Sequence, residues 1–245
     1  MTRIHTVVNQ KGGVGKTTTA INLAAALARR HQNVLLIDLD AQRNASRVLS
    51  NGEMSPTIQD VLTAGTSGKR AVVPSGRDGL MVIPGDARMA DFAVREQDQL
   101  KRALGEITAA YRHIIIDCPP AIDGATRLAL LTCDEVIVPV QCEYLALEGL
   151  ASLMEVLDHV GRERVETLDI RYLLTMFDRR NKLAWEVAQE VRGHLGSLVA
   201  KSVIPRSVRL AEAPGFRRTI FEHDPRGPAA LAYAAFAGEV VDRGR

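Results

Sequence analysis

A glycine-rich segment with two lysines, QKGGVGKTT at residues 10–18, carries the clearest chemistry in this chain of 245 residues. It follows an apolar β-branched run and precedes a helical pattern, which is the context that a phosphate-binding loop requires. Its glycines let the backbone approach a polyphosphate closely, and the N–H groups that open the following helix attract anions. The residues predicted to contact the bound group are Lys11, Gly12, Gly13, Val14, Gly15, Lys16, Thr17 and Thr18.

Two side chains of this segment have specific expected roles. Lys16 is placed to reach the terminal phosphates, and the Thr17 hydroxyl to join a Mg²⁺ shell. The six specified positions of the motif Lys-Gly-Gly-x-Gly-Lys-Thr arise by chance with a probability of roughly 10⁻⁷ per site. This low probability disfavours the alternative that the segment is only a glycine turn at the start of a helix. In the common pattern G-x-x-x-x-G-K-[ST] the first glycine would fall on Gln10, and a second lysine, Lys11, stands at the front of the loop.

Acidic residues end two further apolar runs. Asp38 and Asp40 follow the run 34–37, and Asp117 follows the run 113–116. Carboxylates two positions apart on an extended chain point to the same side. One can orient Mg²⁺-bound water and the other can position the attacking water in phosphoryl transfer. We therefore predict a metal site at Thr17, Asp38 and Asp117, with a capping or turn role as the alternative for Asp38.

The fold that positions these residues can be predicted from the rest of the chain, where apolar β-branched runs alternate with helical patterns. The alternation predicts an α/β fold with a single doubly wound, mostly parallel sheet and helices on both faces, which binds ligands beyond the carboxyl ends of its strands. We expect one domain over residues 1–245, with residues 65–79 as a surface excursion. The predicted strands are 4–8, 34–37, 80–83, 113–116, 135–140, 172–175 and 198–203; the predicted helices are 16–30, 58–62, 98–111, 145–160, 184–194 and 229–241.

Composition narrows the class of protein. The chain is 46% hydrophobic and 24% charged with a formal net charge of +2, so it can bury a sizeable core, and disorder is excluded. Three cysteines without C-x-x-C spacing argue against a disulfide scaffold or zinc ribbon and favour a reducing compartment. No signal peptide or membrane span is indicated, which predicts a cytoplasmic location. The six histidines are scattered singly and are expected to be structural or surface residues.

The motifs resemble the ParA/MinD superfamily, whose deviant Walker A loop reads Lys-Gly-Gly-Val-Gly-Lys-Thr-Thr. The likeness continues through PVQCEYLALEGL at residues 139–150 and SVIPRSVRLAEAP at residues 202–214. It covers nearly all of the chain and is closest to the chromosome- and plasmid-partitioning ParA/Soj family. Two departures stand out: Arg43 replaces a common glycine, and Ser207 replaces a common asparagine.

The resemblance implies a P-loop NTPase with ATP and Mg²⁺ as cofactors and weak ATPase activity. In the family the front lysine, matched by Lys11, contacts the phosphates bound by the other subunit of a nucleotide-sandwich homodimer; binding in cis or facing solvent is the alternative. The aspartate linked to hydrolysis is matched by Asp40. Pro205 and Ser207 match residues that border the adenine. The catalytic set is thus Lys11, Lys16 and Asp40.

A basic segment, residues 201–227, holds six cations against three acids. Its few aromatic residues argue against base stacking and favour contacts with the phosphate backbone. The resemblance implies non-specific binding of double-stranded DNA by the ATP-bound dimer, and an ordinary solvated surface is the alternative. About three cations per subunit give a log–log salt slope of about −2.7 for a monomer and about −5.4 for a dimer. The predicted DNA-binding residues are Lys201, Arg206, Arg209, Arg217, Arg218 and Arg226.

The predicted function is that of a nucleoid-associated partitioning ATPase whose hydrolysis a ParB-type partner stimulates. A MinD-like membrane-positioning ATPase is the alternative, but it needs an amphipathic basic terminal helix, whereas residues 229–241 are apolar over most of their surface. A metal-cluster ATPase would use Cys118 and Cys133, whose spacing is not diagnostic. A small-molecule kinase or ligase would need an acceptor pocket that the sequence does not reveal.

Overall fold

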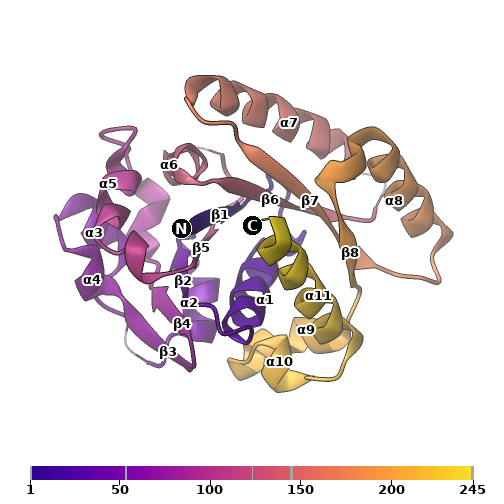
Figure 1. The fold of residues 1–245 in the computed structure, drawn as a ribbon, viewed down its shortest axis with the longest axis horizontal. Coiled ribbons are helices and arrows are strands. Elements are labelled where there is room, and N and C mark those ends of the chain that lie inside the picture. Colours follow the sequence, from indigo (N-terminus) through magenta and orange to yellow (C-terminus); the bar gives the residue numbers. More distant parts are fainter. Residues whose placement is uncertain (1, 53, 123, 144–145, 244–245) are drawn as a thin grey trace.

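An eight-stranded sheet organises the protein, seen in a computed structural model that describes residues 2–52, 54–122, 124–143 and 146–243. The strand order is β3-β4-β2-β5-β1-β6-β7-β8 (Figure 1). Every neighbouring pair is parallel except β3 with β4. The strands are β1 (Arg3–Val7), β2 (Val34–Asp38), β3 (Val73–Arg77), β4 (Leu80–Ile83), β5 (His113–Asp117), β6 (Glu135–Gln141), β7 (Asp169–Phe177) and β8 (Val199–Pro205).

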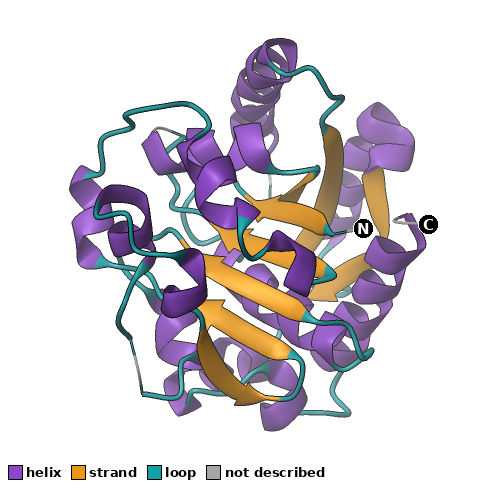
Figure 2. Cartoon of the chain, turned by 60° about the vertical axis from the view of Figure 1, so that its left-hand side comes forward, coloured by secondary structure: helices purple, strands orange, loops and turns teal. Residues whose placement is uncertain are grey.

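Helices cover both faces of this sheet, as Figure 2 shows. In β2, Val34 and Leu36 belong to the apolar core under α1 and α11, while Leu35 and Ile37 belong to the core on the opposite face. The predicted doubly wound, mostly parallel sheet is therefore confirmed. The helices are α1 (Lys16–Ala28), α2 (Asn44–Leu49), α3 (Ile58–Thr63), α4 (Gly68–Ala71), α5 (Gln99–Gly105), α6 (Gly124–Thr132), α7 (Ala146–Glu163), α8 (Lys182–Leu195), α9 (Val208–Glu212), α10 (Ile220–His223) and α11 (Pro228–Arg243).

The central strands determine where the polar residues lie. β2 and β5 are buried along their whole length, which explains their continuous valine, leucine and isoleucine content. β5 pairs with β2 on one side and with β1 on the other, in a register that aligns Asp117 with both Asp38 and Val7. The carboxyl ends of these three strands are therefore adjacent.

The structure corrects the sequence prediction in several segments. Residues 65–79 were expected to be a surface excursion, but they form α4 and the antiparallel edge strand β3, whose Pro74 and Gly76 weaken its strand pattern. The helix predicted over 98–111 ends at Gly105 and is followed by a separate short turn of 3₁₀-helix. The short helices α2, α4, α9 and α10 and the nine-residue α6 were not predicted, since few turns give little periodicity.

A buried polar ladder of four residues crosses the sheet from β5 through β1 and β6 to β7. His5 lies between His113, at 3.0 Å, and the Glu135 carboxylate, at 2.8 Å, and Arg171 donates to the other Glu135 oxygen at 2.8 Å. Burial raises the pKa of Glu135, but the hydrogen bond from His5 and the guanidinium of Arg171 outweigh it and lower that pKa to about 2. His5 and His113 are structural residues, as expected, but they are not isolated from each other, because strand register brings them together.

Candidate active site

The phosphate loop lies between β1 and α1 and is anchored at both ends. Asn9 donates to the Pro139 carbonyl at 2.8 Å and accepts from the Lys11 N–H at 2.9 Å. Thr175, on β7, donates its hydroxyl to the Val14 carbonyl at 2.9 Å. These bonds hold the loop against the carboxyl ends of β6 and β7.

Glycine conformation shapes the loop for an anion. Gly13 has φ of 77° and Gly15 has φ of 92°, values that side-chain-bearing residues rarely adopt. Gly15 occupies the N-cap of α1, where no side chain caps the helix. The first N–H groups of α1 are thus available to an anion, and the helix dipole favours one there.

The two lysines of the loop have different surroundings. The Lys16 side chain is turned into the loop, where its Nζ donates to the Lys11 carbonyl at 3.0 Å, and the residue is 7% exposed. Burial lowers the pKa of Lys16, against the opposing charges of Asp117 and Asp40. Lys11 is half-buried, and its ammonium forms no ion pair with any described residue. The Lys16 ammonium therefore lies inside the loop, where it can contact a bound anion. The Lys11 ammonium is not held by an ion pair with any described residue, so it is able to contact an anion outside the loop.

Asp38 and Asp117 face each other across neighbouring strands but differ in their hydrogen bonds. Asp38 accepts from the Ser46 N–H at 2.8 Å and the Ser46 hydroxyl at 2.6 Å, and from the Asp40 N–H at 3.1 Å. Burial raises the pKa of Asp38 to about 6. Asp117 is fully buried, and neither of its oxygens has a well-oriented hydrogen-bond partner among the described residues. Burial, reinforced by Asp38, raises the pKa of Asp117 well above its usual value.

The chemistry of these side chains fits a Mg²⁺ ion. A buried carboxylate without partners is unfavourable unless something else satisfies it. The Thr17 hydroxyl and the charge of Lys16 both lower the pKa of Asp117, so they lie close to it. Carboxylate and hydroxyl oxygens are hard ligands of the kind Mg²⁺ prefers. Thr17 and Asp117 thus have oxygen atoms that can bind the ion or its water ligands. Asp38 is less suited to this role, because it already accepts three hydrogen bonds.

Asp40 lies just past the end of β2, in the turn that leads to α2. It is half-buried, and its carboxylate accepts from the Gln42 N–H at 2.9 Å. Its charge acts on both Lys16 and Asp117. The structure thus brings Lys16, Asp40 and Asp117 to one edge of the sheet.

A cavity of about 390 Å³ opens beside the phosphate loop. Pro205 and Ser207 line it, as the resemblance implied, and the Ser207 hydroxyl also caps α9 by accepting from the Leu210 N–H at 3.2 Å. A cavity of this size, mostly apolar with a few polar groups, suits a heterocyclic base and its sugar. The sequence analysis missed several of its residues, although Thr175 could have been found as the polar residue ending an apolar strand. The missed lining residues are Gln141, Thr175, Met176, Ile204, Val208, Leu210, Ala211 and Tyr233.

Known proteins resemble this chain in sequence and in fold. The family described as AAA domain matches residues 2–170. The chromosome partitioning protein ParA of Caulobacter vibrioides is 42% identical, over 99% of this chain and 95% of that protein. The chain belongs to the ParA/Soj family. The chromosome-partitioning ATPase Soj of Thermus thermophilus is also 42% identical, over 97% of this chain and 94% of that protein. Among solved structures, cobyrinic acid a,c-diamide synthase from Mycobacterium smegmatis with bound ATP analog and magnesium has a TM-score of 0.83 and 29% identity, over 100% of this chain and 98% of that chain.

Arg43 adopts a backbone conformation that favours glycine. It has φ of 58°, in the left-handed region, and the resemblance described above implies a common glycine at this position. Its Nε is buried without a hydrogen-bond partner among the described residues. This chain therefore carries backbone strain directly after the Asp40 turn.

The segment 139–150, which carries part of the family resemblance, includes Tyr144 and Leu145, which lie outside the described residues.

The predicted DNA-binding residues do not form one uniform group. Arg206 lines the cavity beside the phosphate loop, and Lys201 lies on β8. Arg209 pairs with Glu212 at 3.3 Å, whereas Arg217 and Arg218 follow that helix and form no ion pair with any described residue. All six side chains are exposed: Lys201, Arg206, Arg209, Arg217, Arg218 and Arg226.

The terminal helix α11 and two buried cysteines bear on the alternative functions, a membrane-positioning ATPase and a metal-cluster ATPase. Along α11, Tyr233, Phe236 and Val240 are buried in the core that α11 shares with α1, so this helix is docked as expected. No described helix is long and apolar enough to cross a membrane. Cys118 and Cys133 are completely buried within the subunit, away from any surface where two subunits could share a metal cluster.

Proposed function

We propose that this protein is an ATP-dependent partitioning ATPase that dimerises on ATP binding, binds non-specific double-stranded DNA as the dimer and releases it after hydrolysis. The observation that carries the proposal is the meeting of an uncapped helix start, a buried lysine and a buried carboxylate, without a well-oriented hydrogen-bond partner among the described residues, beside a nucleoside-sized cavity. One P-loop domain over residues 1–245 holds all of these parts. A ParB-type protein that stimulates hydrolysis is the proposed partner, and the nucleoid within the cytoplasm is the proposed location.

Each part of the site has a defined task toward ATP. The cavity around Pro205 and Ser207 takes the adenosine, and the start of α1 takes the phosphates. Lys16 compensates charge on the β- and γ-phosphates. Mg²⁺, when bound near Thr17 and Asp117, neutralises further phosphate charge. Asp40 orients the attacking water by accepting a hydrogen bond from it.

The surroundings of Lys11 support the proposed dimer. Its ammonium is unpaired with respect to the described residues, and ATP carries more negative charge than one lysine and one divalent ion neutralise. A lysine supplied by the second subunit makes pairing depend on the γ-phosphate. Pairing doubles the cations offered to DNA and steepens the salt dependence from about −2.7 to about −5.4. The ATP-bound dimer thus binds DNA far better than the monomer.

A direct test compares DNA binding with membrane binding. Binding to random duplex DNA and to anionic liposomes is measured without nucleotide, with ADP and with ATP, for the wild type, Asp40→Ala and Lys16→Ala. We expect ATP-dependent DNA binding that Asp40→Ala prolongs and Lys16→Ala abolishes. Binding to liposomes in place of DNA would instead establish the MinD-like alternative.

The in-trans role of Lys11 has its own test. Light scattering after size exclusion gives the mass of Lys11→Ala with a non-hydrolysable ATP analogue. We expect a monomer that still binds the analogue. A dimer of wild-type stability would exclude the in-trans role.

A further inference from the structure

Ser46 is a buried hydroxyl residue that lies between three chain segments. It is 0% exposed and lies in the first turn of α2, directly after the Asp40 turn. Its N–H and its hydroxyl both donate to one oxygen of Asp38, at 2.8 Å and 2.6 Å. Its oxygen accepts from the Gly85 N–H at 2.8 Å. Because a backbone N–H only donates, the single hydroxyl proton of Ser46 is committed to Asp38.

The other oxygen of Asp38 leads to Asp40. That oxygen accepts from the Asp40 N–H at 3.1 Å. A continuous chain of hydrogen bonds therefore runs from Gly85 through Ser46 and Asp38 to the backbone of Asp40. Asp40 itself lies beyond the end of β2, where no strand pairing holds it.

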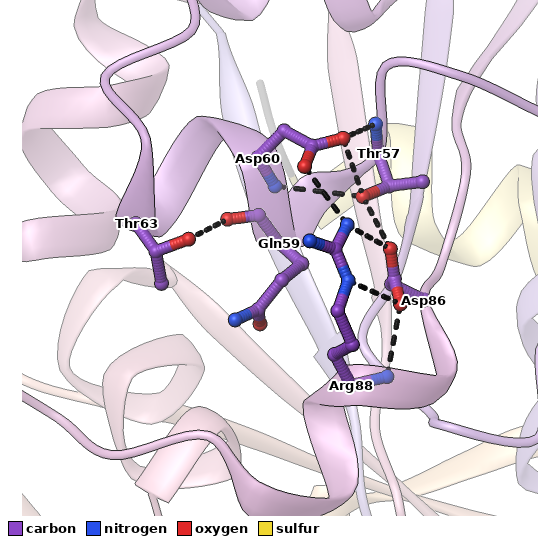
Figure 3. A network of polar contacts seen from close by, with 6 residues as sticks. All are labelled: Thr57, Gln59, Asp60, Thr63, Asp86 and Arg88. Atoms are coloured by element: carbon purple, nitrogen blue, oxygen red, sulfur yellow. Dashed lines mark hydrogen bonds and ion pairs between the residues drawn. The ribbon is translucent and has the colours of Figure 1, made fainter.

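The Gly85 end of this chain is firmly held. A Cβ on Gly85 would lie 3.0 Å from the carboxylate carbon of Asp38, so the backbone there is packed directly against that carboxylate. The next residue, Asp86, accepts from the Thr57 hydroxyl at 2.9 Å and from the Arg88 Nε at 3.0 Å (Figure 3). These bonds attach the chain after β4 to the start of α3, as Figure 3 shows. The chain of hydrogen bonds therefore begins at a fixed point.

We propose that Ser46 is a positioning residue for ATP hydrolysis, which sets the location of the Asp40 carboxylate through Asp38. The inference rests on the proposed function, since it acts through Asp40. Displacement of a reacting group by about 1 Å can lower a rate about a hundredfold, so the support of a water-positioning carboxylate matters. Ser46 lines neither the cavity nor the phosphate loop, and it therefore contributes to the chemical step and not to nucleotide affinity.

The test separates kcat from affinity in Ser46→Ala, Ser46→Thr and a control. Ser50→Ala is the matched control, because Ser50 is the C-cap of the same helix and its hydroxyl is buried without a partner among the described residues. We expect Ser46→Ala to lower kcat by about tenfold or more, with the Kd for an ATP analogue within twofold of wild type. Ser46→Thr retains the hydroxyl and restores kcat, and Ser50→Ala changes neither quantity.

A double variant distinguishes positioning from a general structural effect. If Ser46 acts through Asp40, then Ser46→Ala has no further effect on the residual rate of Asp40→Ala. Should Ser46→Ala fail to fold, Ser46→Cys keeps the volume with a weak donor, and we expect it to lower kcat with unchanged Kd. Wild-type kcat in Ser46→Ala or Ser46→Cys, a parallel loss of affinity in either of them, or additive losses in the double variant would each overturn the inference. An inactive wild-type protein would instead overturn the proposed function.

Discussion

Replacing Arg171 by methionine tests how the buried polar ladder stabilises the sheet. Arg171 is 3% exposed, and its Nε and Nη2 lie 2.8 Å and 2.7 Å from one oxygen of Glu135. Methionine preserves most of the volume but leaves the Glu135 carboxylate buried with only His5 beside it. Removing one partner of a buried ion pair is strongly destabilising because the remaining charge is uncompensated.

The size of the effect follows from the pKa of Glu135. That pKa falls from its usual 4.5 to about 2, and each pKa unit corresponds to about 1.4 kcal/mol, so the ionised Glu135 in its surroundings, burial included, stabilises the folded state by about 3 kcal/mol. Arg171→Met removes one of the two neighbours that lower this pKa and leaves the buried carboxylate with less compensation. We expect the free energy of unfolding at pH 7 to fall by about 3 kcal/mol, and Tm by roughly 6–12 °C for a chain of this length.

The pH dependence has a defined sign. Because the folded pKa of Glu135 is lowered, its contribution is complete above pH 4.5 and is lost as the pH falls toward about 2. Burial also lowers the pKa of His113 to about 3 from 6.5, so the unfolded chain takes up that proton first and acid favours unfolding from pH 6.5 downward. Arg171→Met raises the pKa of Glu135, and its stability should therefore change less with pH between 4.5 and 2 than that of the wild type.

Urea unfolding followed by circular dichroism at pH 7, 4.5, 3.5 and 2.5 measures these quantities. Arg3→Met is the matched control, since Arg3 also joins two strands through an acid, Asp169 at 2.6 Å, but that carboxylate is exposed. We expect the control to lose less than about 1 kcal/mol. A loss for Arg171→Met no greater than that of the control would refute the reasoning.

Three further substitutions probe the site. Thr175→Val leaves the Val14 carbonyl without its donor and should weaken the Kd for an ATP analogue about tenfold, measured by fluorescence titration, while Thr175→Ser should not; equal affinities for both variants would contradict this role. Asp117→Asn replaces a buried carboxylate whose ionisation is opposed by burial, so it should raise Tm without Mg²⁺ and abolish the Mg²⁺ dependence of nucleotide binding; a lower Tm would argue against a destabilising carboxylate. Arg43→Gly relieves a positive φ of 58° and should raise the free energy of unfolding by about 1 kcal/mol in urea titrations, a gain that unstrained backbone would not give.

The parts of the site that sequence predicts are the local ones. The phosphate loop occupies consecutive positions, and Asp38 and Asp117 directly end apolar runs, so the strand pattern alone places them at one edge of the sheet. The strand β3 escaped prediction because proline and glycine interrupt it. The histidine pair and the cavity depend on register and on residues far apart in the chain, such as Val14 and Tyr233, which no local pattern connects.

The support of α1 by α11 has a consequence for how the protein acquires its ligand during synthesis. The Thr19 hydroxyl lies 3.2 Å from the Tyr233 hydroxyl, and Tyr233 also lines the cavity together with Pro205 and Ser207. The ribosome completes the phosphate loop among the first twenty residues, yet the cavity walls around Pro205, Ser207 and Tyr233, which we propose take the base, are translated some two hundred residues later. A nascent chain can therefore present a phosphate loop without retaining a nucleotide, and loading of ATP becomes a late event of translation.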